Sequence, residues 1–236
     1  MITPLTWDSA FFGLSLARVT SSTLDPASAG EVVALARAQH VACLSLLLSG
    51  KDFSSIAAAQ EAGFHLVDVR TTLERPAAQT LPTAPALRVR RQVEADVPAL
   101  EDIAGEAHLN TRFGRDGRFP RDRVAELYRT WIRKECAGSA DEVLVVEAEG
   151  TPLGYVTCQA GAGGAGKIGL IAVRNGERKR GAGTALLRAA LEWLAARGVQ
   201  EVSVVTQGHD VAAMRLYERT GFVTTSVELW FHLWLI

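Results

Sequence analysis

The chain has 236 residues, 48% of them hydrophobic and 22% charged, which excludes a disordered or fibrous protein and leaves one large domain or two small ones. Its 25 Lys and Arg residues nearly balance 26 Asp and Glu residues, so the chain lacks the basic excess typical of proteins that bind DNA or RNA. Three well-separated cysteines without a CxxC pair argue against a disulfide framework or a thiolate metal site. Because no signal-peptide pattern or membrane-length apolar run is found, we expect a cytoplasmic protein.

The first 75 residues are predicted to form a small α/β domain. The expected elements, in order, are a strand at 11–19, a helix at 31–40, a strand at 42–48, a helix at 53–62 and a strand at 65–73. Three prolines follow between residues 76 and 86. Because proline lacks an amide donor and keeps its predecessor extended, this segment is predicted to be a linker that no helix crosses.

Residues 87–236 are predicted to form a second, larger domain of mixed α/β class. Strands are expected at 87–93, 142–147, 153–159, 167–173, 201–206 and 222–234, and helices from Glu94, around Tyr128, at 182–197 and at 210–220. Glu149 and Gly150 predict a hairpin turn between the second and third of these strands.

The first domain repeats the order of elements found at the end of the chain. The sequences Ala-Gln-Glu-Ala-Gly-Phe (59–64) and Tyr-Glu-Arg-Thr-Gly-Phe (217–222) occupy equivalent places, between a helix and the strand that follows it. Our hypothesis is that the N-terminal part is a degenerate copy of the C-terminal half-domain. The alternative is coincidence, because strand–helix–strand units are common.

The most informative segment is Val173-Arg-Asn-Gly-Glu-Arg-Lys-Arg-Gly-Ala-Gly-Thr184. A strand ends there, a basic loop with two glycines turns, and an amphipathic helix begins. Glycines let successive amide groups point the same way, and the helix N-terminus adds partial positive charge, so the loop is suited to a phosphate or pyrophosphate. It lacks the Gly-Lys-Ser/Thr of a Walker loop and the third glycine of a dinucleotide fingerprint. Taken alone, the pattern could equally be a solvated helix start.

The wider pattern is more specific. Arg178-x-x-Gly181-x-Gly183 is followed one strand later by Asp210-x-x-Ala213-x-x-Leu216-Tyr217-x-x-x-Gly221-Phe222. Together these motifs resemble the GCN5-related N-acetyltransferase (GNAT) superfamily from Leu87 to the end of the chain. The resemblance implies a mixed, splayed central sheet flanked by helices, preceded here by a partial GNAT-like domain. It also implies acetyl-CoA between the strands at 167 and 201, held by Ile171, Val173, Arg178, Lys179, Arg180, Gly181, Ala182, Gly183, Thr184 and Asp210.

The resemblance gives Tyr217 the role of general acid toward the thioester sulfur. An ordinary tyrosine has a pKa near 10 and a thiol one near 8.5, so a strong hydrogen bond to the departing thiolate is the more conservative interpretation. The alternative is a core aromatic residue. Asp210 departs from the family's usual Asn, and an ionised Asp can only accept hydrogen bonds, so it could instead cap its helix. The base stays open among His108, His209, Glu177 and a water chain.

Three further segments narrow the class of substrate that the sequence indicates. Residues 4–13, 108–113 and 128–132 resemble acetyltransferases that modify the 4-amino group of a dTDP-linked 4-amino-4,6-dideoxygalactose. In this interpretation Arg112 and its neighbours Arg115, Arg118, Arg121 and Arg123 could pair with phosphate oxygens. Phe113, Phe119 or Trp131 could stack on thymine. The alternative is a solvated face with local ion pairs, because Asp116 and Asp122 interleave with these arginines.

The predicted function is therefore acetyl-CoA-dependent N-acetylation of a nucleotide-linked amino sugar by direct transfer through a tetrahedral intermediate. One alternative is a GNAT enzyme that acetylates a protein N-terminus, an antibiotic or a polyamine. Another is a non-catalytic acyl-CoA-binding module. We expect the binding partner to be a small-molecule amine, and we expect no nucleic acid, membrane or metal. A homodimer is compatible with the sequence.

Overall fold

The computed structural model describes residues 1–79 and 87–236, and in these ranges ten strands form one mixed sheet. The predicted linker lies largely at 80–86, outside the described residues. The strands are β1 (Ile2–Pro4), β2 (Leu16–Val19), β3 (Cys43–Ser49), β4 (His65–Pro76), β5 (Arg88–Arg91), β6 (Glu142–Ala148), β7 (Thr151–Ala160), β8 (Ala165–Val173), β9 (Glu201–Gln207) and β10 (Val223–Trp234). Their spatial order is β1-β2-β3-β10-β4-β9-β8-β7-β6-β5.

Helices cover both faces of this sheet. They are α1 (Thr6–Phe12), α2 (Pro26–Ala38), α3 (Phe53–Glu61), α4 (Val97–Ala107), α5 (Arg112–Asp116), α6 (Arg121–Lys134), α7 (Ala182–Ala195) and α8 (Val211–Arg219). Helix α6 continues into one π-helical turn, Glu135–Ser139. The predicted α/β class, with a mixed sheet flanked by helices, is confirmed.

The predicted strand at 11–19 is wrong in its first half. Residues Thr6–Phe12 form α1, and β2 begins only at Leu16. The helix ends at Gly13, whose φ of 68° is in the left-handed region that glycine adopts at low cost. Phe12 packs against Phe113 and Phe119, so distant aromatic contacts decide a segment whose local pattern is ambiguous.

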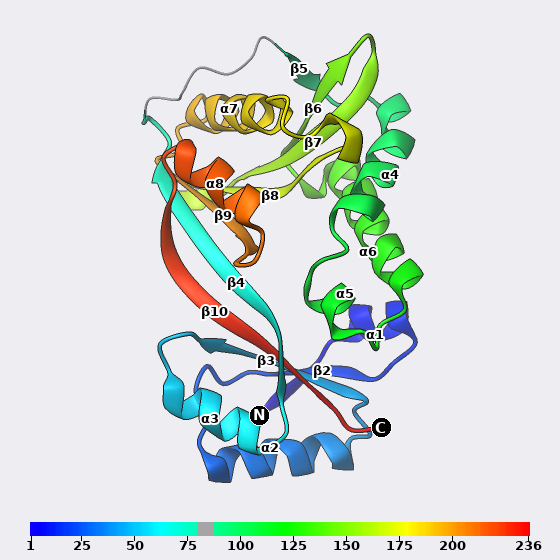
Figure 1. Ribbon diagram of the computed structural model, residues 1–236, viewed down its shortest axis with the longest axis vertical. Coiled ribbons are helices and arrows are strands. Elements are labelled where there is room, and N and C mark those ends of the chain that lie inside the picture. The colour runs from blue at the N-terminus through cyan, green and yellow to red at the C-terminus, as the bar shows by residue number, and fades with distance from the viewer. Residues whose placement is uncertain (80–86) are drawn as a thin grey trace.

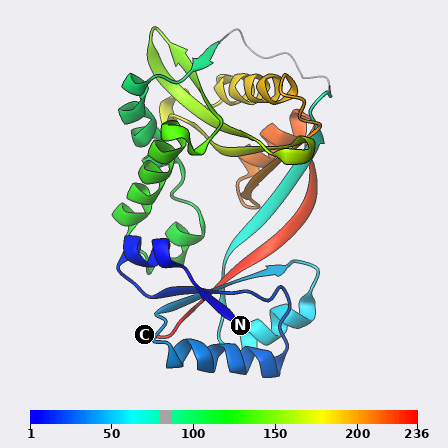
Figure 2. The same cartoon turned by 180° about the vertical axis from the view of Figure 1, so that it is seen from behind.

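The molecule is elongated, and β4 and β10 run side by side between its two ends (Figure 1). Strands β1–β3 with α2 and α3 lie at one end, and strands β5–β9 with α4, α7 and α8 lie at the other (Figures 1 and 2). Strand β4 pairs with β9 as well as β10, whereas β10 also pairs with β3. Each half therefore contributes its last strand to a position beside the other half.

Three apolar clusters correspond to this arrangement. One lies between α7, α8 and strands β6–β9, and a second between α4, α6 and strands β6–β8, with residues of α1 and α5. The third joins α2 and α3 to β1–β3 and the end of β10. Among the described residues, no helix combines the length and apolarity needed to cross a membrane.

Candidate active site

Strands β8 and β9 separate partway along their length. Their parallel pairing runs only from Ala165 opposite Glu201 to Ile168 opposite Val204. Beyond that point β8 keeps its partner β7, and β9 keeps its partner β4, so their facing backbone edges have no strand partner. Ile171 and Val173, predicted to hold acetyl-CoA, lie in the part of β8 that forms this open edge.

A β-bulge accompanies the separation. The β7–β8 register shifts between Val156 and Cys158, and the Thr157 hydroxyl oxygen accepts a hydrogen bond from the Leu170 amide at 2.8 Å. A Cβ atom on Gly169 would come within 2.5 Å of that oxygen, so the close approach requires glycine. Because bulges bend the strand that contains them, this feature explains how β8 diverges from β9.

The loop between β8 and α7 exposes amide groups. Gly181 occupies the N-cap of α7 with φ of 90°, and no side chain caps the helix. Outside α7 itself, no amide from Arg178 to Thr184 donates to a backbone carbonyl of a described residue. Arg178, Lys179 and Arg180 are exposed around these amides. The loop thus has both the helix-terminal charge and the side-chain charge that suit an anion, and the binding of a pyrophosphate there stays a prediction.

Two contacts hold the loop in this shape. The Arg178 Nε group donates to the Val173 carbonyl at 3.1 Å, and Arg180 forms an ion pair with Glu177 at 3.2 Å. Gly183 faces α8, since a Cβ there would lie 3.2 Å from Leu216 Cδ2. This close helix contact brings the N-terminus of α7 next to the helix that contains Tyr217.

Tyr217 is 2% exposed, and its ring packs edge-on against Phe222. Its hydroxyl is bonded to no other described residue. Burial raises the pKa of Tyr217 well above its ordinary value, and the nearby charge of Asp210 raises it further. Asp210 caps α8, because its carboxylate accepts a hydrogen bond from the Ala213 amide at 2.9 Å. The capping alternative is observed, and a contact of Asp210 with the cofactor stays a prediction.

His108 ends α4 close to the α7 loop. Its Nε2 atom lies 3.1 Å from the Tyr155 hydroxyl, and its ring stacks on Tyr128. Burial, together with the charge of Arg178, lowers the pKa of His108 to about 4 against the opposing effect of Asp210. The imidazole is therefore neutral near pH 7, but with so low a pKa it is too weak a base to hold the proton of an attacking amine, and hydrogen bonding suits it better.

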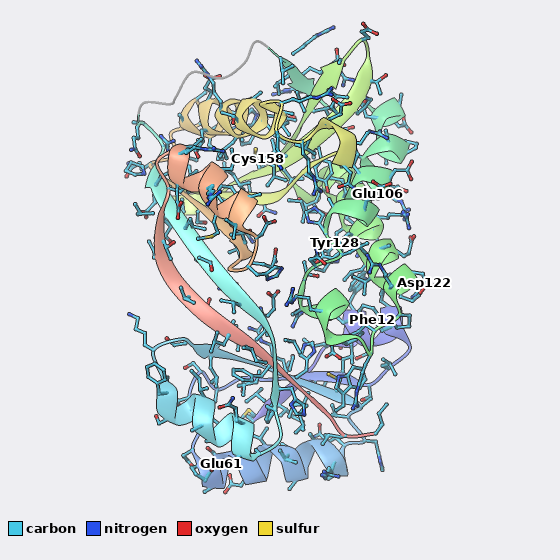
Figure 3. The ribbon with its side chains drawn as sticks, in the orientation of Figure 1. Phe12, Glu61, Glu106, Asp122, Tyr128 and Cys158 are labelled. Atoms are coloured by element: carbon cyan, nitrogen blue, oxygen red, sulfur yellow. The ribbon has the colours of Figure 1, made fainter. Side chains whose placement is uncertain are left out.

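Tyr128 lies on α6, and its ring is the one that contacts His108 (Figure 3). It donates a hydrogen bond to the Thr111 hydroxyl at 2.9 Å, and burial raises its pKa to about 12. Tyr155 of β7 is fully buried. The resemblance pointed to the segments of His108 and Tyr128 but not to Tyr155, whose strand pattern is that of an ordinary core residue.

The other two candidate bases occupy different places. Glu177 is in the α7 loop and pairs with Arg180. His209 lies between β9 and α8, with its Nδ1 atom 3.6 Å from a carboxylate oxygen of Asp68 on β4. Asp68 is 6% exposed, and burial raises its pKa against the opposing effects of the Val69 amide and His209.

The loop that contains His209 is anchored to β4, because the Gly208 amide donates to the Val69 carbonyl at 2.7 Å. Sequence reasoning did not find Asp68. Its proximity to His209 depends on β4 lying between β9 and β10, and no local motif indicates that position.

The predicted substrate-binding residues are more buried than expected. The Arg112 guanidinium lies between the rings of Phe113 and Trp230, at 4.3 and 4.2 Å from their centroids. Phe113 is 3% exposed and packs in the second apolar cluster. Trp131 packs edge-on against Tyr128. The faces of the Phe113 ring are thus covered by protein, and its predicted stacking on a base has no support in this arrangement.

Cys43, Asp116 and His232 are one group within the described residues whose donor atoms all lie within 4.8 Å of one another. Asp116 is bonded to His232 Nδ1 and accepts from Trp234 Nε1 at 3.0 Å. Burial, followed by the charge of Asp116, raises the pKa of the Cys43 thiol to about 12. With the thiol protonated and the carboxylate already paired, this group joins α5 to β10.

Comparisons with known proteins agree with this geometry. The model described as "Acetyltransferase (GNAT) family" matches residues 100–222, just over half of the chain. A dTDP-fucosamine acetyltransferase from Escherichia coli is 29% identical over 234 residues, which cover 98% of this chain and 97% of that protein. The spore coat polysaccharide biosynthesis protein SpsD from Bacillus subtilis is 26% identical over 157 residues, 64% of this chain and 52% of that one.

A solved structure of a GCN5-related N-acetyltransferase from Sphaerobacter thermophilus has the same fold. Its TM-score is 0.62 at 21% identity, covering 87% of this chain and 65% of that chain. The splayed strands, the exposed amides before α7 and the buried tyrosine on α8 are arranged within this fold. The protein belongs to the GNAT family of acetyltransferases and is an N-acetyltransferase, in a family that uses acetyl-CoA as co-substrate.

Proposed function

We propose that the protein acetylates the amino group of a dTDP-linked amino-dideoxy sugar with acetyl-CoA. The observation that supports acetyl-CoA use most directly is the open β8–β9 edge, bounded at its carboxyl ends by the α7 loop and by α8. Similarity over nearly the whole length to a dTDP-fucosamine acetyltransferase supports the nucleotide-sugar substrate.

In this proposal the amides from Arg178 to Thr184 bind the pyrophosphate of acetyl-CoA, with Arg178, Lys179 and Arg180 around it. The backbone groups of Ile171 and the amide of Val173 pair with the pantetheine arm as an added strand would, whereas the Val173 carbonyl is bonded to Arg178. Amide groups at a helix N-terminus bind phosphate well, and an unpaired strand edge is a ready partner for an extended amide-containing chain.

Tyr217 acts in the proposed mechanism as a hydrogen-bond donor to the leaving sulfur. Transfer is direct, through a tetrahedral intermediate. The ordinary pKa values of tyrosine and a thiol already make full proton transfer uphill by about 2 kcal/mol. Burial raises the pKa of Tyr217 further, so the hydroxyl stays protonated at neutral pH and stabilises the thiolate by hydrogen bonding.

The proton of the attacking amine goes to His209 in this scheme. Within the described residues, His209 is the candidate base that has a carboxylate beside it. A carboxylate next to an imidazole fixes its tautomer and stabilises its charged form. His209→Gln should accordingly lower kcat more than it changes either KM.

Two other functions compete with this proposal. A GNAT enzyme for cationic amines or protein N-termini would be favoured by an acid-lined groove, whereas the segment from Arg112 to Arg123 supplies arginines. A non-catalytic acyl-CoA-binding module would not require a buried tyrosine hydroxyl close to the open edge.

Thiol release from acetyl-CoA tests the proposal with a panel of dTDP-linked amino sugars, peptides, polyamines and aminoglycosides. We expect turnover with one or more of the nucleotide sugars. Turnover with peptides or drugs alone would reject the sugar substrate, and tight CoA binding without any turnover would support the binding module. In an active panel member, Tyr217→Phe should lower kcat about a hundredfold with little change in the KM for acetyl-CoA.

A further inference from the structure

We propose that a pocket between α5 and the ends of β4 and β10 binds the diphosphate of the substrate. This inference rests on the proposed function for the identity of that substrate. The pocket has a volume of about 260 Å³. Its polar walls come from Arg115 and Arg118 on one side and from His65, Asp116, His232 and Trp234 on the others. We call it the diphosphate pocket.

The structure separates the arginines of this region by their contacts. Arg112 is enclosed between two aromatic rings, and Arg123 donates to the Phe11 carbonyl and covers the Phe11 ring. Arg121 is exposed at the start of α6 and lies outside the pocket. Arg112 and Arg123 are therefore already in contact with protein groups, and Arg121 lies outside the pocket. None of the three is placed to bind a ligand there.

Arg115 and Arg118 differ from them. Both are exposed, both line the pocket, and neither forms an ion pair with any residue in 1–79 or 87–236. A guanidinium presents several fixed N–H donors that match phosphate oxygens. Two such groups on one concave surface provide the charge and the donors that a diphosphate requires.

Asp116 lies between these arginines, and a free carboxylate there would repel an anion. Its side chain is 4% exposed, however, and is bonded to the ring of His232 and the indole of Trp234. These bonds anchor the end of α5 to β10. Although Asp116 lines the pocket, its carboxylate is thus largely covered by these partners, and it holds the segment that contains both arginines.

The turn after α5 completes the arrangement. Gly117 has φ of 78°, a left-handed conformation that reverses the chain between Asp116 and Arg118. The Arg118 guanidinium then lies over the Trp234 ring, 5.4 Å from its centroid. Because this contact restrains a long flexible side chain, part of the entropy cost of binding a ligand is already met.

The pocket lies a short distance along β4 from the proposed base. His65 lines the pocket and Asp68 lies beside His209. Because of a bulge in β4, His65 and Asp68 pair with His232 and Trp230, two residues apart on β10, which is about 7 Å along a strand. The Asp68 carboxylate also senses the charge of Arg115. In a hexose, the 4-amino group is across the ring from the carbon that bears the diphosphate. One sugar ring between the pocket and His209 therefore fits the spacing of the two sites.

The test compares Arg115→Gln, Arg118→Gln and the double variant with Arg121→Gln, an exposed arginine of the same segment outside the pocket. The Kd values of dTDP and of inorganic pyrophosphate are measured by calorimetry. For a sugar that is turned over, KM and kcat are measured as well. Each single pocket variant should weaken dTDP binding and raise the sugar KM about tenfold to a hundredfold. The kcat, the acetyl-CoA KM and the Arg121→Gln control should change less than about twofold.

The outcomes distinguish this proposal from the proposed function. If wild-type protein binds dTDP, loses that binding in the pocket variants and acetylates no amino sugar of the panel, the diphosphate pocket stands and the proposed function fails. If wild-type protein acetylates a dTDP-linked sugar while the double variant keeps its sugar KM and dTDP Kd, the pocket is rejected and the proposed function stands. Absence of dTDP and pyrophosphate binding in wild-type protein also rejects the pocket.

Discussion

His108 illustrates how a single side chain connects pH to stability in this fold. Its pKa is lowered to about 4, against an ordinary value of 6.5, chiefly by burial. Between these two pH values the unfolded chain binds more protons than the folded one. The free energy of unfolding therefore has its full His108 contribution above about pH 6.5 and loses it as the pH falls toward 4.

Urea denaturation of wild-type protein and His108→Gln at several pH values from about 4 to 8 checks this expectation. The glutamine can still hydrogen-bond to Tyr155 but does not titrate. The stability difference between the two proteins should shift in favour of the variant as the pH falls below about 6.5. A difference that stays constant over this range would contradict the lowered pKa.

At the residue scale, the site residues that could be predicted are those that belong to motifs on neighbouring stretches of sequence. Tyr217 and Gly181 belong to motifs on consecutive elements, so their residue types and spacing identify them. Asp68 is far from His209 in sequence, and only the sheet order brings them together. Phe113 lies in a polar, arginine-rich segment that looks exposed. It packs against nearby Phe119 and against Phe12, which lies about 100 residues earlier in the chain.

The N-terminus of α7 is the element whose backbone shape matters most. Gly181 has φ of 90°, so an alanine there would cost roughly 1 kcal/mol or force the loop to move. We expect Gly181→Ala to raise the KM for acetyl-CoA several-fold, because the amides would no longer converge on one anion. The KM for the amine substrate should change little.

A matched control exists in the same loop. Gly176 has no left-handed conformation, and a Cβ there would meet no atom within 4 Å. Gly176→Ala should therefore leave the acetyl-CoA KM and the calorimetric Kd of CoA unchanged. Equal effects of the two substitutions would show that the loop geometry at Gly181 is not required for binding.

At the element scale, periodicity gave the strands and helices of the C-terminal half close to their observed bounds. Helix α7 and strands β8 and β9 have strong patterns and clear end signals, and the predicted ranges match within a few residues. Short elements were missed, namely β1, α1 and α5. Helices of five or seven residues contain too few turns for a hydrophobic period, and their stability comes from tertiary contacts.

The fold of the whole molecule depends on strand exchange between its halves, in which β4 pairs with β9 and β10, and β10 pairs with β3 and β4. About the central β10–β4 pair, the parallel pair β2–β3 on one side matches the parallel pair β8–β9 on the other. We propose that this symmetry reflects the duplication suggested by the repeated order of elements. The sequence indicated two similar series, but it contained no local signal for which strand lies next to which. The division into domains at 1–75 and 87–236 stays a prediction. Strand pairing crosses the boundary between these two ranges, since β10 pairs with β3 and β4 pairs with β9.

Interleaved strands make a strong prediction about fragments. A chain of residues 87–236 alone lacks β4, so β9 and β10 lose the strand that joins them and the apolar cluster around α7 loses the fully buried Leu73. The same fragment lacks Arg75, which is 1% exposed and donates to the Gln79 carbonyl at 2.5 Å and to the Thr220 carbonyl. We expect this fragment to be unfolded or aggregated, because exposed strand edges promote association.

The complementary experiment keeps both halves. A protease site inserted between Gln79 and Leu87 allows the folded protein to be cut into two pieces. Because β4 is paired on both sides by strands of the other piece, the cut protein should elute as a 1:1 complex and keep its thiol-release activity. The uncut insertion variant controls for the inserted residues. A fragment 87–236 that gave native circular dichroism and a cooperative melting transition by itself would show instead that the halves fold independently and that the strand exchange is dispensable.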